Sequence, residues 1–282
     1  MGAAEDNWLD CRCGQRHWGV FGAAGLLVWH RGNVLLQLRA DRSHHGGTWA
    51  LPGGARRRGE SPLATALREG REEAGLRADR LSPAWRVIAD HTGWAYTTIG
   101  AEAGADPLEG PANWETARLE WVEVEAVAGF DLHPGLRQVW PTLRDLVGKR
   151  ATLVVDAANV VGSTPDGWWR DRAGAARRLL AELEPVARRG LANTGDGPPN
   201  AWYPKLVLVV EGQARGIGPG EGVDVVEAPG GGDDQIVTEA RRAVAAGAGP
   251  VEVATADKAL IARLRLVGAG VMRPGTLLQA IR

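Results

Sequence analysis

The feature that most constrains this chain is a set of carboxylates with helical spacing. Glu69, Glu72 and Glu73 stand at i, i+3 and i+4, and this spacing places the three side chains on one face of an α-helix. Like charges that are neighbours on an exposed helix repel each other by about 0.2–0.5 kcal/mol per pair. A divalent cation removes this repulsion, and Mg²⁺ or Mn²⁺ suits the task because both prefer carboxylate oxygen and water and usually meet the phosphates of a substrate. The pattern therefore predicts a helix that carries a divalent metal site.

The residues around these carboxylates predict where the helix begins and ends. Ser61 can act as its N-cap, and Pro62 suits the first helical position because the N–H that proline lacks would be unpaired there. Gly75 is expected to end the helix in the left-handed conformation that glycine adopts readily. The apolar residues between the two ends form the stripe that we expect to be buried: Leu63, Ala66, Leu67 and Ala74.

The stretch from Gly54 to Leu76 resembles the Nudix box. That motif reads Gly, five residues, Glu, seven residues, then Arg-Glu-U-x-Glu-Glu-x-Gly-U, where U is apolar, and every fixed letter is matched here. The one departure is Gly70 at the first U; a glycine inside a helix costs roughly 0.5–1 kcal/mol relative to alanine, but no ligand is lost. The resemblance covers about residues 15–147 and implies an α/β/α sandwich that splits a nucleoside diphosphate linked to another group.

The resemblance also implies a role for each box residue. Glu72 and Glu73 would bind the metal, and Glu69 would be a further ligand or the base that activates water. Arg68 would orient these carboxylates through bidentate hydrogen bonds. Gly54 would carry the loop beside the metal, where a side chain would obstruct it. Glu60 would support the start of the helix or the outer shell of the metal.

Outside the helix, the sequence indicates metal ligands and substrate-binding residues less specifically. Glu115 precedes Trp121 by six residues, which resembles a family feature in which a ligand Glu precedes the Trp of the next strand; a surface-loop acid is the alternative. Residues 46–54 are most similar to members that hydrolyse nucleoside triphosphates, whereas members acting on ADP-ribose often have Pro where this chain has Thr92. Candidate substrate-binding residues are Gly54, Trp49 and Arg39, and Trp94, Trp114 and Trp121 are further candidates for stacking on a base.

From Arg150 onward the chain alternates between strand-like and helix-like segments. This alternation predicts an α/β domain with a mainly parallel sheet, so we divide the chain into domains at residues 1–148 and 151–282. Acids follow several of the expected strands, and the carboxyl ends of parallel strands meet at one edge of a sheet. Converging carboxylates repel unless a cation binds them, which predicts a second Mg²⁺ or Mn²⁺ site. An amphipathic helix is expected over about 170–188 and a loop over 190–204.

Four short motifs in this half resemble the NYN domain, a branch of the PIN-like nucleases. They are Val-Asp-x-x-Asn (155–159), Val-Val-acid-Gly (209–212), Asp-x-x-Ile (233–236) and Thr-x-Asp (255–257). The resemblance implies a Rossmann-like fold and metal-dependent hydrolysis of RNA, with Asp156, Asp233 and Asp257 as metal ligands. Glu211 stands where the family commonly has Asp. An inactive Rossmann-like scaffold is the alternative. The residues expected to assist are Asn159, Glu211, Asp171 and Asp234.

Three functions are consistent with two acidic clusters in one chain. The leading hypothesis is a magnesium-dependent nucleotide hydrolase fused to a ribonuclease-like domain. In the second, one half senses a nucleotide and regulates the other. In the third, the two halves act in turn on RNA ends, by pyrophosphate removal or decapping followed by cleavage.

Composition sets outer limits on these hypotheses. With 44% apolar and 24% charged residues in 282, the chain is typical of a soluble globular protein. No apolar run approaches the roughly 18–20 residues that span a bilayer, so we expect no membrane partner and a cytoplasmic location. The formal net charge of −1 lacks the strong positive field of a dedicated nucleic-acid binder, so RNA is a possible partner only through local basic residues. Nothing in the sequence fixes the oligomeric state.

The two cysteines of the chain, Cys11 and Cys13, are separated by one residue, and His17 follows closely. A disulfide framework is therefore not expected. A closed structural zinc site needs four ligands, usually with wider cysteine spacing. A reduced surface turn is the favoured interpretation, and a metal site is the alternative.

Overall fold

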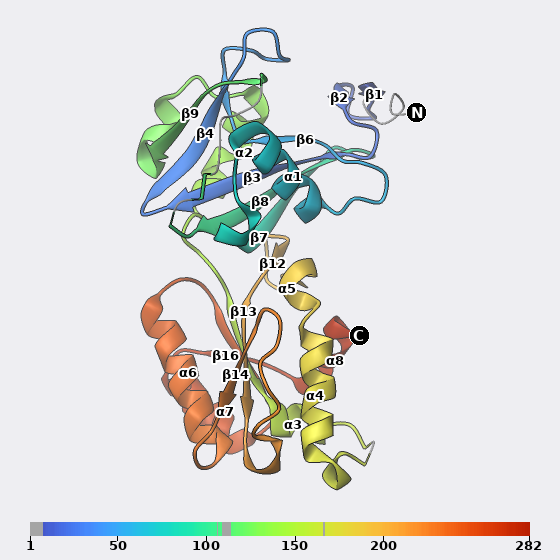
Figure 1. Cartoon of the computed structure of the whole chain (residues 1–282), viewed down its shortest axis with the longest axis vertical. Coiled ribbons are helices and arrows are strands. Elements are labelled where there is room, and N and C mark those ends of the chain that lie inside the picture. The colour runs from blue at the N-terminus through green and yellow to red at the C-terminus, as the bar shows by residue number, and fades with distance from the viewer. Residues whose placement is uncertain (1–7, 106, 109–113, 166) are drawn as a thin grey trace. The chain divides into compact units, whose positions relative to one another are not determined.

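The computed structural model describes residues 8–105, 107–108, 114–165 and 167–282. The chain divides into two compact units (Figure 1). The first unit comprises Met1–Gly148 with Asn193–Ala201, and the second comprises Lys149–Ala192 with Trp202–Arg282. In the described part of the chain, no helix is long and apolar enough to cross a membrane.

The first unit is built on a mixed sheet with the strand order β7-β8-β3-β4-β5, in which β6 also pairs with β3 and β9 with β4. The pair β3–β8 is parallel, whereas β7–β8, β3–β4 and β4–β9 are antiparallel. The strands are β3 (Ala23–His30), β4 (Asn33–Arg39), β5 (Trp49–Ala50), β6 (Gly53–Ala55), β7 (Leu81–Asp90), β8 (Ala95–Ala103) and β9 (Thr116–Glu123). Two short strands, β11 (Leu191–Ala192) and β12 (Ala201–Trp202), flank the Asn193–Ala201 segment. Helical segments are α1 (Pro62–Ala74), η1 (Ala78–Arg80), η2 (Val124–Gly129) and α2 (Pro134–Arg144). The α/β class predicted for this half is confirmed.

Helix α1 begins and ends where its sequence predicts. The Ser61 side chain accepts a hydrogen bond from the backbone N–H of Ala64, Pro62 occupies the first turn, and Gly75 has a φ of 62°. Gly70 is buried against β3, where a Cβ would lie 2.8 Å from Cδ2 of Leu26. The glycine that costs helix propensity therefore allows α1 to approach the sheet closely.

The second unit is an all-parallel five-stranded sheet with the order β14-β13-β10-β15-β16, which confirms the predicted parallel α/β architecture. Alternate residues of its central strands face opposite sides. Val155 and Leu208 pack in one apolar cluster with α4 and α8, whereas Val154 and Val207 pack in another with α6 and α7. Helices thus cover both faces (Figure 1). The elements are β10 (Thr152–Asp156), α3 (Ala157–Gly162), η3 (Trp168–Arg170), α4 (Arg172–Leu183), α5 (Val186–Arg189), β13 (Lys205–Val210), η4 (Gly212–Ala214), β14 (Val223–Glu227), α6 (Gly232–Ala246), β15 (Val251–Ala254), α7 (Lys258–Leu266), β16 (Gly270–Met272) and α8 (Pro274–Ile281).

Two expectations about the second half need correction. The helix expected over 170–188 is two helices, because α4 ends at Leu183 and α5 begins after Pro185, whose ring cannot continue the hydrogen-bonded pattern. The expected loop contains residues that belong to the first unit: Asn200 donates its N–H to the carbonyl of Arg86 in β7 at 2.9 Å, and its Oδ1 accepts from the N–H of Ile88 at 2.7 Å.

The N-terminal hairpin consists of β1 (Trp8–Asp10) and β2 (Arg16–Trp18), which form a separate two-stranded antiparallel sheet. Its register pairs Trp8 with Trp18 and Leu9 with His17. Both tryptophans are exposed.

Candidate active site and a second acidic cluster

Arg68 lies at the centre of the carboxylate cluster on α1. Its Nε and Nη2 donate to the two oxygens of Glu60 at 2.9 and 3.0 Å, a bidentate pair. Its Nη1 donates to Glu69 Oε1 at 2.6 Å and to Glu72 Oε2 at 3.2 Å. The sequence predicts bidentate bonds to the helix carboxylates; in the structure the bidentate partner is Glu60, and Glu69 and Glu72 receive one bond each. One guanidinium thus holds three carboxylates.

Glu60 ties the preceding loop to the helix. It accepts hydrogen bonds from the backbone N–H of Arg57 at 3.0 Å and from Oγ1 of Thr65 at 2.9 Å. The hydrogen bonds from Arg68, together with these two, hold the pKa of Glu60 at about 2. This carboxylate is therefore ionised across the working pH range and keeps Arg68 in place.

Glu73 is the buried member of the cluster, with 2% of its surface exposed. Its Oε2 accepts hydrogen bonds from the backbone N–H of Gly53 at 2.7 Å and from Nε2 of Gln37 at 3.1 Å. Burial nevertheless raises its pKa to about 8, and the nearby charge of Glu69 adds to the effect. A carboxylate so placed needs either a proton or a cation to be stable.

Gln37 is a hydrogen-bond partner of Glu73 that the sequence reasoning missed. It is fully buried in β4, and its Oε1 accepts a hydrogen bond from Oγ1 of Thr116 at 3.2 Å. The same hydroxyl of Thr116 also donates to the backbone carbonyl of Glu73 at 2.9 Å. The available signal was one amide within the otherwise apolar run Val34–Leu38.

Glu69 and Glu115 lie within electrostatic reach of each other. Burial raises the pKa of Glu69, the hydrogen bond from Arg68 opposes the change, and the charges of Glu72 and Glu115 add to it. Glu115 lies in the turn directly before β9, where its backbone carbonyl accepts the N–H of Ala40 at 2.8 Å. The fold therefore brings the predicted loop acid to the carboxylates of α1.

Gly54 leaves room for the carboxylate of Glu69. A Cβ at this position would lie 2.6 Å from Oε1 of Glu69, closer than two such atoms can approach. The geometry agrees with the expectation that a side chain here would obstruct the site. Four carboxylates, one buried and two partly buried, supply the all-oxygen donor set that hard divalent cations such as Mg²⁺ prefer.

The residues predicted to contact the substrate differ in how exposed their side chains are and in which partners they already have. Trp49 is half-buried, packs edge-on against Phe130 with ring centroids 5.2 Å apart, and lies 5.9 Å from the guanidinium of Arg118. Arg39 donates from Nε to the carbonyl of His44 at 2.9 Å. Trp94 is 9% exposed and donates to the carbonyl of Gly19, so it is a packing residue and not available to stack on a base. Trp121 is half-buried, and Trp114 is 74% exposed.

A cavity of about 480 Å³ opens beside the loop that follows β4. His45 and Thr48 line one side, and residues at the start of α2 line the other. His133 adjoins it, with its ring centroid 4.7 Å from that of His45. Burial lowers the pKa of His133 to about 4, and the charge of Arg39 contributes. Arg39 also acts on Glu73, so this arginine lies within electrostatic reach of both the cavity and the carboxylates.

The model of the NUDIX domain matches residues 21–143 of this chain. A Mycobacterium tuberculosis protein named putative 8-oxo-dGTP diphosphatase 3 is 46% identical over 150 residues, which cover 49% of this chain and 69% of the relative. The chain belongs to the Nudix family. The matched residues lie in its first unit, and the protein is a Nudix hydrolase.

The chain is also similar to two further proteins that are named as Nudix hydrolases. A nucleoside triphosphate pyrophosphatase/Nudix hydrolase fusion protein of Bifidobacterium longum is 38% identical over 156 residues, covering 52% of this chain and 32% of the relative. The crystal structure of the M. smegmatis Nudix hydrolase RenU is 45% identical and matches 50% of this chain and 93% of its own, with a TM-score of 0.47.

Within the second unit, a separate group of acids lies at the carboxyl edge of the parallel sheet. Asp156 ends β10 and is 7% exposed. Its Oδ1 accepts the N–H of Asn159 at 3.0 Å and its Oδ2 accepts the hydroxyl of Thr255 at 2.9 Å. Burial raises its pKa, and the charges of Asp233 and Glu211 raise it further.

Asp233 and Asp257 complete this group. Burial raises the pKa of Asp233, and the charge of Asp257 is the next cause. Asp257 caps α7 through the N–H of Leu260 at 2.8 Å. Glu211, whose reach the sequence left open, accepts the N–H of Gly232 at the start of α6 and so approaches the group from β13.

The remaining predicted residues of the second cluster have other partners. Oδ1 of Asn159 accepts the N–H of Ala256 at 2.7 Å, which links the α3 turn to the end of β15. Asp171 caps α4 by accepting the N–H of Gly174 at 2.8 Å. Asp234 is exposed and pairs with Arg263 at 2.5 Å.

Proposed function

We propose that this Nudix hydrolase acts on oxidised purine nucleoside triphosphates of the 8-oxo-dGTP type. Water would attack the phosphoanhydride, and the products would be the nucleoside monophosphate and pyrophosphate. The observation that carries the proposal is the 46% identity with a protein named for that substrate, together with a carboxylate cluster that meets the chemical needs of the reaction. The loop at residues 46–54 is most similar to that of family members that hydrolyse nucleoside triphosphates, and it supports the same substrate class.

Glu69, Glu72, Glu73 and Glu115 are the residues that would hold Mg²⁺ or Mn²⁺. The buried Glu73, whose pKa is raised to about 8, would be the ligand that gains most from a cation, because coordination removes the need for a proton. When bound, the metal would neutralise charge on the substrate phosphates and favour ionisation of water.

Glu69 is the carboxylate that would take the proton of the attacking water, and Arg68 would hold it in the ionised form. Burial favours the neutral form of Glu69, and the 2.6 Å hydrogen bond from Arg68 to Oε1 favours the ionised form. The free Oε2 would then be able to accept a proton or serve as a ligand. Both assignments proposed for Glu69, base and ligand, require this ionised form.

The nucleotide itself would extend from the carboxylates toward the cavity beside His45 and Thr48. Arg39 supplies positive charge between the two, as a triphosphate requires. Trp49 presents a half-buried aromatic surface nearby for the base.

A panel of normal and oxidised nucleotides, assayed for pyrophosphate release with Mg²⁺ and with Mn²⁺, tests this function. We expect 8-oxo-dGTP to be turned over with a higher kcat/KM than dGTP. Glu73→Gln should lower kcat/KM by about 100-fold or more, because a metal ligand worth several kcal/mol is lost. Glu125→Gln, an exposed acid in η2 of the same unit, is the matched control and should behave as wild type. Unchanged turnover in Glu73→Gln would contradict the assignment of the metal site to these carboxylates. Turnover confined to other nucleotides would contradict 8-oxo-dGTP as the substrate.

For the second unit we propose metal-dependent cleavage of RNA at Asp156, Asp233 and Asp257, as the NYN resemblance implies. The supporting observation is the convergence of these acids at one sheet edge with raised pKa values at Asp156 and Asp233. Asp156→Asn should abolish Mn²⁺-dependent cleavage of single-stranded RNA, whereas Asp224→Asn, on exposed β14 surface, should not. RNA cleavage that changes with added nucleotide would favour regulation by the Nudix unit. Hydrolysis of 5′-triphosphate RNA would favour the hypothesis that the two units act in turn on RNA ends. If the wild-type chain cleaves no RNA, the second unit is instead an inactive scaffold.

A further inference from the structure

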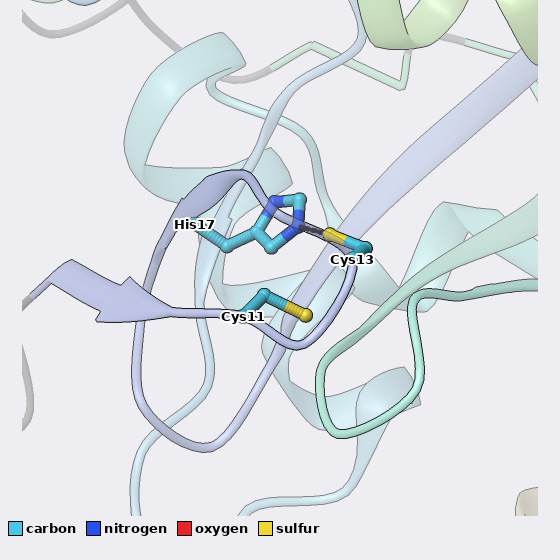
Figure 2. A group of neighbouring side chains, drawn as sticks. All are labelled: Cys11, Cys13 and His17. Atoms are coloured by element: carbon cyan, nitrogen blue, oxygen red, sulfur yellow. Dashed lines mark hydrogen bonds between the residues drawn. The ribbon is translucent and has the colours of Figure 1, made fainter.

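The turn between β1 and β2 brings three metal-binding side chains together. The ligand atoms of Cys11, Cys13 and His17 all lie within 4.8 Å of one another. Figure 2 shows both sulfurs and the imidazole gathered at the mouth of the same turn. The closest pair is Cys13 Sγ and His17 Nε2, at 3.2 Å. Tetrahedral zinc with bonds of about 2.0–2.3 Å places its ligand atoms about 3.5–3.8 Å apart, so binding requires side-chain shifts of only about 1 Å.

Backbone geometry explains how cysteines one residue apart can share a site. The N–H of Cys11 donates to the carbonyl of Gln15 at 2.9 Å, and the N–H of Gly14 donates back to the carbonyl of Cys11 at 3.0 Å. Gly14 has a φ of 83°, a conformation that suits glycine. In an extended strand, neighbours at i and i+2 would point the same way but stay apart; the closed turn curls Cys13 back toward Cys11 and His17. The narrow spacing that argued against a metal site is thus compatible with one.

His17 is held in a binding orientation before any metal arrives. Its ring stacks on that of Trp94, with centroids 4.1 Å apart and planes 7° from parallel. Trp94 is itself fixed in the core by its hydrogen bond to Gly19.

Backbone pairing gives the hairpin little stability of its own. Within the described residues, β1 and β2 pair only with each other, and each has three residues. Trp8 and Trp18 are 37% and 42% exposed. A two-stranded hairpin of this kind is at best marginally stable, whereas a structural metal supplies folding free energy directly.

We propose that Cys11, Cys13 and His17 bind one Zn²⁺ through Sγ, Sγ and Nε2, and that His91 supplies the fourth ligand. Zinc is the metal that two thiolates and imidazole nitrogen select. The two cysteines each lose a thiol proton to solvent on binding, and Cys11 gives up its hydrogen bond to the carbonyl of His91. The ring of His91 is adjacent, with its centroid 4.6 Å from that of His17.

His91 follows directly after β7, so its coordination would join the hairpin to the main sheet of the same unit. The site is chemically distinct from the carboxylates of α1, which offer only hard oxygen donors. The two sites should therefore select different metals from a mixture.

Metal content and cobalt spectroscopy of the full-length chain test the proposal. We expect one zinc per chain to survive gel filtration in chelator-free buffer. After removal of zinc with EDTA, Co²⁺ should give a thiolate-to-cobalt charge-transfer band and the intense visible bands of tetrahedral cobalt. Calorimetric titration of zinc into the metal-free chain, in buffers of different ionisation enthalpy, should show that two protons are released for each zinc bound.

Matched variants separate this site from other metal binding. Cys13→Ser and His17→Phe, the latter keeping the stack on Trp94, should weaken zinc affinity by about 100-fold or more, since losing a ligand exceeds the 10–100-fold cost of losing an outer-shell partner. Gln15→Ala, exposed in the same turn, and Glu73→Gln, in the carboxylate site, should retain wild-type zinc affinity.

Three results would overturn the proposal in whole or in part. A wild-type chain that retains no zinc and shows no thiolate–cobalt band lacks the site. Equal zinc retention by a Cys11→Ser/Cys13→Ser double variant would place the metal elsewhere. Unchanged affinity in His91→Ala would remove His91 from the ligand set. Circular dichroism and nucleotide turnover of each variant establish that the rest of the chain is folded.

Discussion

Replacing the buried Glu73 by glutamine should abolish metal-dependent activity and, at alkaline pH without metal, stabilise the protein. A glutamate has a pKa near 4.5 when solvated, whereas burial raises that of Glu73 to about 8. The folded state thus holds a proton that the unfolded chain has already released. A raised carboxyl pKa means that stability falls as pH rises from about 4.5 through about 8.

The size of the effect follows from the two pKa values. At about 1.4 kcal/mol per pH unit, the interval from 4.5 to about 8 corresponds to a ceiling near 5 kcal/mol for the ionised, metal-free state. Rearrangement of the site and entry of water lower this to about 1–3 kcal/mol in practice. Glutamine keeps an amide oxygen for the N–H of Gly53 and the side chain of Gln37, which both bond Oε2 in wild type, and removes the charge.

Thermal unfolding in EDTA at pH 5.5, 7.0 and 8.5, followed by tryptophan fluorescence, measures this prediction. Relative to Glu73→Gln, the wild-type transition should fall as pH rises and lie lower at pH 8.5. Mg²⁺ at pH 8.5 should restore the wild-type transition and leave the variant unchanged. Glu125→Gln controls for the loss of one acid and should follow wild type. A Glu73→Gln chain that is less stable than wild type at pH 8.5 in EDTA would refute the reasoning.

Three further substitutions probe how the cluster is held. Gly54→Ala places a Cβ 2.6 Å from Oε1 of Glu69 and should lower kcat/KM by about 10–100-fold through loss of a charge-assisted hydrogen bond worth about 1.5–3 kcal/mol, with an unchanged far-ultraviolet spectrum. Gly70→Ala gains about 0.5–1 kcal/mol of helix propensity but crowds Leu26 at a cost of about 1–3 kcal/mol, so urea denaturation should show net destabilisation. Arg68→Lys keeps the charge but not the fork geometry; kcat should fall by about tenfold or more while KM changes little, and an unaffected kcat would contradict the positioning role.

The sequence allowed the prediction of features that depend on neighbours along the chain. Helix α1 is one such feature, because Ser61 and Gly75 act on residues within one turn. The convergence of Asp156, Asp233 and Asp257 was predictable too, since parallel strands place their carboxyl ends at one edge. Both results follow from local geometry and from the regularity of secondary structure.

Features that depend on what packs against a residue could not be predicted in this way. Gly70 looks like a defect until Leu26 is known to lie 2.8 Å from where a Cβ would be. Arg68 prefers Glu60 to the helix carboxylates because the loop before α1 folds back, and no spacing rule encodes that.

In each acidic cluster, one arginine pairs with some of the acids and leaves another with uncompensated charge. That remaining charge indicates where a cation is needed. In the first, Arg68 bonds Glu60, Glu69 and Glu72, while the raised pKa of Glu73 marks charge that remains uncompensated. In the second, Arg263 bonds the outer Asp234 and lowers the pKa of Asp233 only in part, so that of Asp233 remains raised.

In both units the outer acids are thus neutralised by the protein, and the inner acids retain the electrostatic cost of burial. That cost is lowest when a divalent cation binds, so metal affinity should concentrate on the inner carboxylates. If so, removing an outer acid will weaken metal binding less than removing an inner one. Calorimetric Mn²⁺ titration of Glu72→Gln and Glu73→Gln measures the difference for the first cluster, and equal losses in both variants would contradict this account.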